Sequence, residues 1–156
     1  MRQSELLTIG YEGASIEDFV ATLEHLEVKI VIDIRELPIS RKRGFSKNKL
    51  NEWLKAAGIR YLHLKDLGDP RLGREAARRG DMNLFRDIFS DHMNTERAKI
   101  ALDEAQSIAQ SEKSCLLCFE RLHKNCHRDI VANSLSDLGF TIRHVGVRAD
   151  IRQLAN

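Results

Sequence analysis

The chain has 156 residues, of which 42% are hydrophobic and 31% charged, and its formal net charge is only +2. This composition indicates a soluble globular protein, and no apolar run approaches the roughly 18 residues that a membrane span requires. Three cysteines and the lack of an apolar signal segment after Met1 argue against a disulfide framework. We therefore expect one domain, over residues 1–156, in the reducing cytoplasm.

Apolar runs and helical periodicities alternate along the chain. Five strands are predicted at residues 6–9, 29–34, 59–64, 114–119 and 140–145. Helices are predicted at about residues 15–26, 46–57, 82–93, 95–110 and 126–138. The polar segment 65–80, with three glycines and Pro70, is predicted to be a long loop. The alternation predicts an α/β three-layer sandwich, with helices on both faces of a mainly parallel five-stranded sheet, Rossmann-like without a G-x-G-x-x-G loop.

The helix over residues 46–57 has the clearest predicted limits. Ser46 is suited to cap its start, where Phe45 and Leu50 are spaced as a hydrophobic staple. Gly58 follows the last turn, as expected of a residue that ends a helix in the left-handed conformation.

The carboxyl ends of parallel strands meet at one edge of a sheet, which is where open α/β sheets bind ligands. The residues expected at this edge are Gly10, Tyr11 and Glu12, then Asp33 and Arg35, then His63 and Lys65, then Cys118 and Glu120, then Gly146 and Arg148. Strand alternation directs Asp33 and Arg35 to one side, and likewise Cys118 and Glu120. Such pairs either line a site or form ion pairs that support the loops.

The predicted helix that begins at Cys126 carries His127 and Arg128 in its first turn, where the helix dipole disfavours cations. A negative group is expected to compensate, either the carboxylate of Asp129 or Glu120 or an external phosphate or carboxylate. At a helix start beside cations, the pKa of Cys126 is expected to fall, which favours a nucleophile. The alternative is a small, partly buried cysteine without chemistry.

Zinc is an open alternative at the same place. Cys118, His123, Cys126 and His127 offer thiolate and imidazole ligands. Seven residues separate the two cysteines, rather than the two to four of the short C-x2-4-C spacing, so no metal ligands are assigned and no cofactor is expected.

Basic residues are clustered in two segments. Arg41, Lys42, Arg43, Lys47 and Lys49 follow one another without an acid, and Arg71, Arg74, Arg78 and Arg79 form a second group. The first group follows the second predicted strand, so it is expected to border the same edge and attract phosphates. The alternative is a solvated loop. Tyr11, Phe45, Trp53 and Tyr61 are candidates for base stacking, although Trp53 and Tyr61 also suit a core.

The sequence resembles the family catalogued as domain of unknown function 488. The similar motifs lie at residues 8–11, 32–41, 58–64, 67–68, 116–120 and 126–128. The last two are the specific part, a C-x-E strand end followed by Cys-His-Arg. Many family members have histidine where this chain has Tyr11. The resemblance implies a single α/β domain from a bacterial or archaeal cytoplasm, and it implies no particular activity.

Three functions are compatible with these residues. The first is binding of a nucleotide or nucleic acid in an anion pocket at the sheet edge, where Arg35, Arg41 and Arg128 hold phosphate with the helix start at Cys126. Asp33, Glu120 and His63 would be its polar or acid–base groups, and Gly10, Tyr11, Arg43 and Cys118 would also contact the ligand.

The second function is a cysteine-dependent enzyme acting on an anionic substrate. Cys126 would be its nucleophile, His127 or His63 its base, and Arg128 would orient the substrate. The third is a non-catalytic partner-binding or sensor domain, in which the Cys-His-Arg cluster locks the fold.

Overall fold

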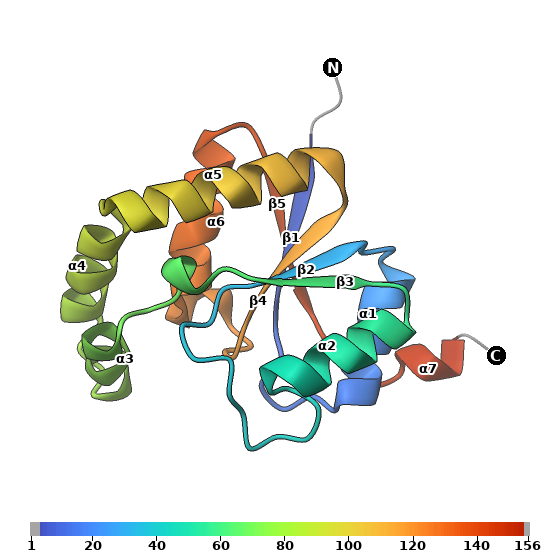
Figure 1. The fold of residues 1–156 in the computed structure, drawn as a ribbon. Coiled ribbons are helices and arrows are strands. Elements are labelled where there is room, and N and C mark those ends of the chain that lie inside the picture. Colours follow the sequence, from blue (N-terminus) through green and yellow to red (C-terminus); the bar gives the residue numbers. More distant parts are fainter. Residues whose placement is uncertain (1–3, 155–156) are drawn as a thin grey trace.

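Five parallel strands form the centre of the molecule (Figure 1). They are β1 (Glu5–Gly10), β2 (Ile30–Asp33), β3 (Arg60–His63), β4 (Ser114–Cys118) and β5 (Thr141–Gly146). Their order across the sheet is β3-β2-β4-β1-β5. The computed structural model describes residues 4–154, so residues 1–3 and 155–156 of the predicted domain lie outside the described part.

Helices cover both faces of the sheet. They are α1 (Ile16–His25), α2 (Lys47–Ala56), α3 (Arg71–Arg78), α4 (Met82–Met93), α5 (Glu96–Ser111), α6 (His127–Asp137) and α7 (Ile151–Leu154), with short 3-10 turns η1 (Lys65–Leu67) and η2 (His123–Asn125). The predicted three-layer α/β architecture is therefore confirmed. No helix within residues 4–154 is long and apolar enough to cross a membrane.

The strands are apolar on both sides because each side packs against helices. In β4, Leu116 belongs to the hydrophobic cluster formed with α4, α5 and α6. Its neighbours Cys115 and Leu117 belong to the opposite cluster, formed with α1 and α2. This alternation explains why the central strands read as continuous apolar runs rather than as alternating patterns.

Helix α2 begins and ends where predicted, but without the expected side-chain capping bond. Gly58 has a φ of 75°, and the Ile59 N–H donates to the Leu54 carbonyl at 2.9 Å, as in a Schellman motif. Ser46 stands at the N-cap position without a side-chain capping bond. Its hydroxyl donates instead to the Ser40 carbonyl at 3.0 Å, so the predicted cap position is confirmed, the expected capping bond is not formed, and the hydroxyl closes the preceding loop.

The prediction of a loop over residues 65–80 is wrong, because this segment contains η1 and α3. The proline and glycine that suggested a loop have specific positions at the start of α3. Pro70 occupies the N-cap position of α3, and Gly73 faces Asp69 within the first turn. A Cβ atom at Gly73 would lie 2.1 Å from Asp69 Oδ1, so the glycine allows close packing and does not break the helix.

Candidate functional site

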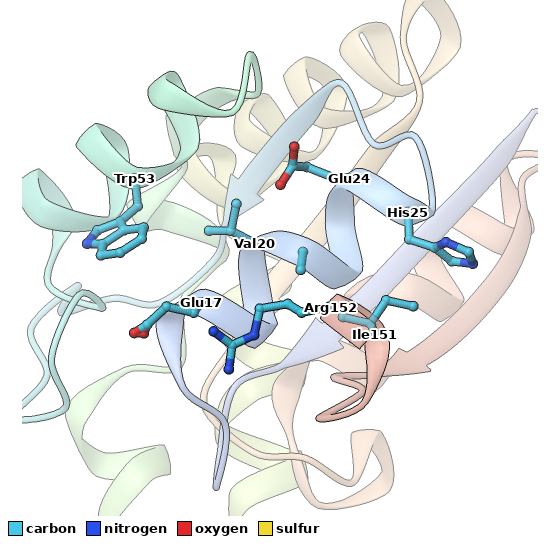
Figure 2. A pocket seen from close by; sticks show the side chains of 8 residues that line it. Glu17, Val20, Glu24, His25, Trp53, Ile151 and Arg152 are labelled. Atoms are coloured by element: carbon cyan, nitrogen blue, oxygen red, sulfur yellow. The ribbon is translucent and has the colours of Figure 1, made fainter. Parts of the chain in front are cut away.

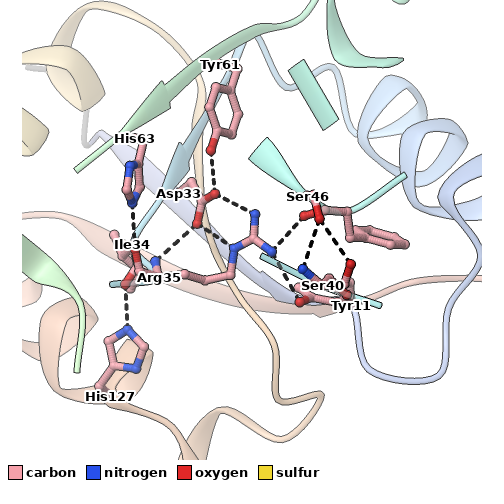
Figure 3. A network of polar contacts seen from close by, with 10 residues as sticks. Tyr11, Asp33, Ile34, Arg35, Ser40, Ser46, Tyr61, His63 and His127 are labelled. Carbon is pink, nitrogen blue, oxygen red and sulfur yellow. Dashed lines mark hydrogen bonds and ion pairs between the residues drawn. The ribbon is translucent and has the colours of Figure 1, made fainter. Parts of the chain in front are cut away.

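The predicted edge residues lie at the carboxyl ends of the parallel strands. The main chain that follows β2 links two of the groups, because two imidazoles donate to its carbonyls. The His127 imidazole donates from Nε2 to the Ile34 carbonyl at 2.7 Å. His63 donates from Nε2 to the next carbonyl, that of Arg35, at 2.6 Å. The segment after β2 therefore connects the Cys-His-Arg cluster to the Asp33 side of the edge (Figure 3).

Asp33 and Arg35 form a buried, bidentate ion pair (Figure 3). The Arg35 Nε and Nη2 groups donate to the two carboxylate oxygens at 2.9 and 2.7 Å, and Nη1 donates to the Phe45 carbonyl at 2.7 Å. The Tyr61 hydroxyl also donates to Asp33, at 2.5 Å, and burial together with this carboxylate raises the pKa of Tyr61. All three Arg35 side-chain nitrogens are thus occupied by protein groups.

Gly10 and Tyr11, both predicted to contact a ligand, are packed against other parts of the edge. A Cβ atom at Gly10 would lie 1.7 Å from the Glu120 carbonyl oxygen, so the glycine admits the loop after β4. The Tyr11 ring is only 3% exposed and stacks on the buried Phe45 ring at 4.3 Å. These positions fix the loops around the edge.

Cys118 and Cys126 are in direct contact at the start of α6. Their Sγ atoms lie 2.6 Å apart, and the Cys126 Sγ accepts the Arg128 backbone N–H at 3.4 Å. Cys126 is only 3% exposed, and burial, with the neighbouring Cys118 thiol, raises its pKa. The predicted fall in this pKa is therefore wrong, because desolvation outweighs the helix N-terminus and His127, whose Nδ1 lies 3.6 Å away.

Arg128 is held by neutral oxygens and not by an acid. Its guanidinium donates to Thr8 Oγ1 at 3.2 Å and to the carbonyls of Glu120 and Arg121 at 3.1 and 3.3 Å. Within residues 4–154, no carboxylate forms an ion pair with it, so neither predicted internal partner, Asp129 or Glu120, has that role. Arg128 is 1% exposed and ties the loop after β4 to β1.

Asp69 is a buried titratable group that sequence reasoning missed. It is 6% exposed, and its Oδ1 has no hydrogen-bond partner within the described residues. Burial raises its pKa to about 6, although the charges of His127 and Arg74 oppose this rise. Strongly perturbed carboxyl groups concentrate at functional sites. The only sequence signal was its place after the Leu67-Gly68 motif.

A basic pocket lies beside the loop that follows β2. This cavity of about 460 Å³ is lined by Ser40, Arg41, Lys42, Arg43, Gly44, Ser46, Lys49 and Trp53. Arg41 and Lys42 form no ion pair within residues 4–154. Arg43 pairs with Glu17 and lies 5.5 Å from the Trp53 ring centroid. The predicted contact residues Arg41 and Arg43 thus share a pocket whose lining does not include Arg35 or Arg128.

A second, larger cavity shares Trp53 with the basic pocket (Figure 2). Its volume is about 580 Å³, and its lining is Glu17, Val20, Ala21, Glu24, His25, Trp53, Ile151 and Arg152. The lining mixes acidic and basic side chains over α1 and α7. This cavity could not be found from the sequence, because α7 was not predicted.

The four predicted zinc ligands do not form one group. Cys118 and Cys126 lie with Glu120, whereas His123 lies with Asp129 and His144. His127 is held by the Ile34 carbonyl. Asp129 and His144 could not be assigned to such a group from the sequence, because they lie in α6 and β5, which come together only in the folded protein.

The fold and this edge define an α/β protein with an all-parallel five-stranded sheet. The family model described as Domain of unknown function DUF488 matches residues 15–135, and the chain belongs to this family. The matched segment contains the resembling motifs from residue 32 onward, which confirms the resemblance. No curated protein and no solved structure matches the chain.

Proposed function

We propose that the basic pocket binds a phosphate-bearing ligand, a nucleotide or a nucleic acid. The observation that carries the proposal is the lining, which combines four cationic side chains with one tryptophan. Two of these cations, Arg43 and Lys49, pair with Glu17 and Glu52 outside the lining, whereas Arg41 and Lys42 form no ion pair within residues 4–154. Clustered cations attract phosphates, and an accessible indole ring offers a stacking surface to any base. Trp53 is partly exposed at this place, in contrast to the covered rings of Tyr11 and Phe45.

The start of α2 adds to the positive potential of the pocket. The first turn of this helix contains no acidic residue, and the Ser46 hydroxyl is bonded to Ser40 instead of capping it. The positive end of the helix dipole is therefore not offset by a local carboxylate, and it favours an anion nearby.

The buried ion pair supports the loop that forms this pocket. Arg35 donates to the carbonyl of Phe45, which lies between the lining residues Gly44 and Ser46. Asp33 and Arg35 therefore act as positioning residues for the pocket, and we propose no contact between them and the ligand.

The test is binding of a fluorescein-labelled single-stranded oligonucleotide, ADP and inorganic pyrophosphate to the full chain at low salt. Trp53 is the only tryptophan, so its fluorescence reports a ligand in the basic pocket or in the larger cavity that shares this residue, and a variant of the basic pocket distinguishes the two. A stacked base is expected to quench it, whereas pyrophosphate is not. The double variant Arg41→Ala/Lys42→Ala is expected to weaken oligonucleotide binding about tenfold or more.

The chain offers a matched control. Arg78→Ala/Arg79→Ala also removes two positive charges, but from the end of α3, outside the pocket. This variant is expected to bind like the unchanged chain. Equal losses in both double variants would show that binding is not specific to the basic pocket, and the proposal would be wrong. No measurable binding of any of the three probes would also contradict it.

One observation favours the cysteine-dependent enzyme as a second candidate, namely that Cys126 lies beside His127 in a region that also holds Asp69. The raised pKa of Cys126 opposes an activated thiolate in the described conformation. Iodoacetamide at neutral pH is therefore expected to alkylate Cys126 no faster than Cys115, which is also buried. Mass spectrometry would measure both rates, and selective modification of Cys126 would support the enzyme instead.

A further inference from the structure

Three side chains with metal-binding atoms converge on the α6 side of β5. His123 comes from η2, Asp129 from the first turn of α6, and His144 from β5. One ligand atom of each lies within 4.8 Å of the others. His123 Nδ1 is 2.8 Å from Asp129 Oδ1, and His144 Nε2 is 3.7 Å from the same oxygen.

These separations are close to those of a coordinated ion. Nitrogen and oxygen ligands lie about 2.0–2.2 Å from zinc, which places two ligands of a tetrahedral site about 3.3 Å apart. The distances of 2.8 and 3.7 Å fall on either side of this value. One ligand atom of each residue lies within 4.8 Å of the other two, so a rearrangement of the side chains alone would bring all three around one ion.

A hydrogen bond to Thr8 fixes which nitrogen of His144 is available. Its Nδ1 contacts Thr8 Oγ1 at 2.5 Å, and the same hydroxyl accepts a bond from Arg128 at 3.2 Å. Thr8 is fully buried. Since Nδ1 is occupied, Nε2 is the nitrogen that faces Asp129. Metal-binding histidines characteristically have their second nitrogen held in this way.

The two imidazole rings are stacked, with centroids 3.5 Å apart and planes within 2° of parallel. A ring nitrogen binds a metal in the plane of its ring, so binding to one ion requires the rings to tilt. His123 is well placed to tilt, because its side chain is 30% exposed and η2 is a single short turn.

We propose that His123, Asp129 and His144 bind one divalent first-row transition metal ion such as Zn²⁺. Two imidazoles and one carboxylate suit this class of ion and do not suit Mg²⁺ or Ca²⁺, which prefer oxygen ligands. All three side chains are partly exposed, so three protein ligands leave coordination positions open to water. The site is independent of the basic pocket and of the proposed function.

The group Cys118, Glu120 and Cys126 is the competing place for the same ion. Two thiolates bound to zinc at about 2.3 Å lie about 3.7 Å apart. The observed Sγ–Sγ distance is 2.6 Å, so the buried thiols would have to separate and lose protons first. In the histidine group, the partly exposed His123 can tilt without displacing a buried side chain.

The test is calorimetric titration of the chelator-treated full chain with Zn²⁺, with Mg²⁺ as a comparison. One Zn²⁺ per chain and no Mg²⁺ binding are expected. Asp129→Asn and His123→Ala should each weaken Zn²⁺ binding by about 100-fold or more, because each removes a direct ligand. Circular dichroism melting would verify that both variants fold, and His123 is the safer residue to replace because it lies in a single short turn and its side chain is partly exposed.

Two further measurements, the spectrum of bound Co²⁺ and the Zn²⁺ affinity of a cysteine variant, distinguish the histidine group from the cysteine group. Co²⁺ bound to histidine and carboxylate lacks the intense near-ultraviolet charge-transfer band of a cobalt thiolate, and Cys118→Ser should leave Zn²⁺ affinity unchanged. A thiolate band, or a loss of affinity confined to Cys118→Ser, would place the ion on the cysteines and overturn the proposal. Absence of Zn²⁺ binding, or unchanged affinity in Asp129→Asn and His123→Ala, would overturn it as well.

Discussion

At the scale of single residues, the ion pair of Asp33 and Arg35 shows what the sequence does and does not reveal. Alternation along β2 correctly directed both side chains to one side, because a strand has a period of two. It could not reveal the hydroxyl of Tyr61, which reaches Asp33 from β3, or the carbonyl of Phe45. Because these groups occupy the ion pair, Arg35 acts as a structural brace. The sequence does not reveal these contacts, because they depend on the order of the strands in the sheet.

The first prediction concerns this brace. Arg35→Met is expected to reduce the free energy of unfolding by about 3–5 kcal/mol, because it leaves the Asp33 carboxylate buried without a counter-charge. The double variant Asp33→Asn/Arg35→Met removes the stranded charge and is expected to recover part of the loss. Urea denaturation of the three proteins would measure both effects. A loss below about 1 kcal/mol in Arg35→Met would contradict a buried, essential pair.

A second prediction concerns the pH dependence that Asp69 introduces. Its pKa is about 6 in the folded chain and 3.8 for an unperturbed aspartate, so the folded state holds this proton more tightly. The resulting stability is fully present below pH 3.8 and is lost as pH rises through 6. The ionised side chain then costs at most about 3 kcal/mol, because solvent screening reduces the cost of the charge.

Asp69→Asn is therefore expected to stabilise the chain most above pH 7, with a smaller gain at pH 5. Urea denaturation at pH 5 and pH 8 would measure the difference, which we expect to be about 1–2 kcal/mol. An equal effect of the substitution at both values would mean that Asp69 is ionised throughout, and that its burial has little electrostatic consequence.

At the scale of elements, helix ends and strands were predictable where signals were local. Gly58 ended α2 as expected, since the left-handed turn after a helix needs only neighbouring residues. Helix α3 was missed for the opposite reason. Gly73 reads as a break in isolation, but the glycine is required by the nearby Asp69 side chain, and only the folded turn shows this contact.

Helix α3 provides the third prediction. In an exposed helix, glycine to alanine stabilises by up to about 1 kcal/mol. Gly73→Ala is expected to destabilise by about 1–3 kcal/mol instead, because the new Cβ would lie 2.1 Å from Asp69 Oδ1. In a chain that also carries Asp69→Ala, the same change should become neutral or stabilising. Chemical denaturation of this double-mutant cycle would measure the coupling, and additive effects would disprove the contact.

At the scale of the whole molecule, the order β3-β2-β4-β1-β5 explains which predicted site residues stay apart. The sequence predicted correctly that polar strand ends share one edge. It could not predict that Asp33 and Arg35 face the α1 and α2 side while Cys126 and Arg128 lie at the start of α6. One rim therefore carries two different sets of side chains, and the exposed cations of the basic pocket lie apart from the buried Arg128.

The last prediction rests on the separation between the cations of the basic pocket and the buried Arg128. The chain has a net charge of only +2, so long-range attraction is weak and oligonucleotide binding should depend on the local cations of the basic pocket. For single strands, the slope of log K against log salt is about −0.7 for each neutralised phosphate. If four cations contact phosphates, the slope is about −3, and Arg41→Ala/Lys42→Ala should reduce its magnitude to about 1.4.

Fluorescence anisotropy between about 50 and 200 mM salt would measure both slopes. Arg78→Ala/Arg79→Ala should retain the slope of the unchanged chain, and a shallower slope in this control would mean that the phosphates also contact α3.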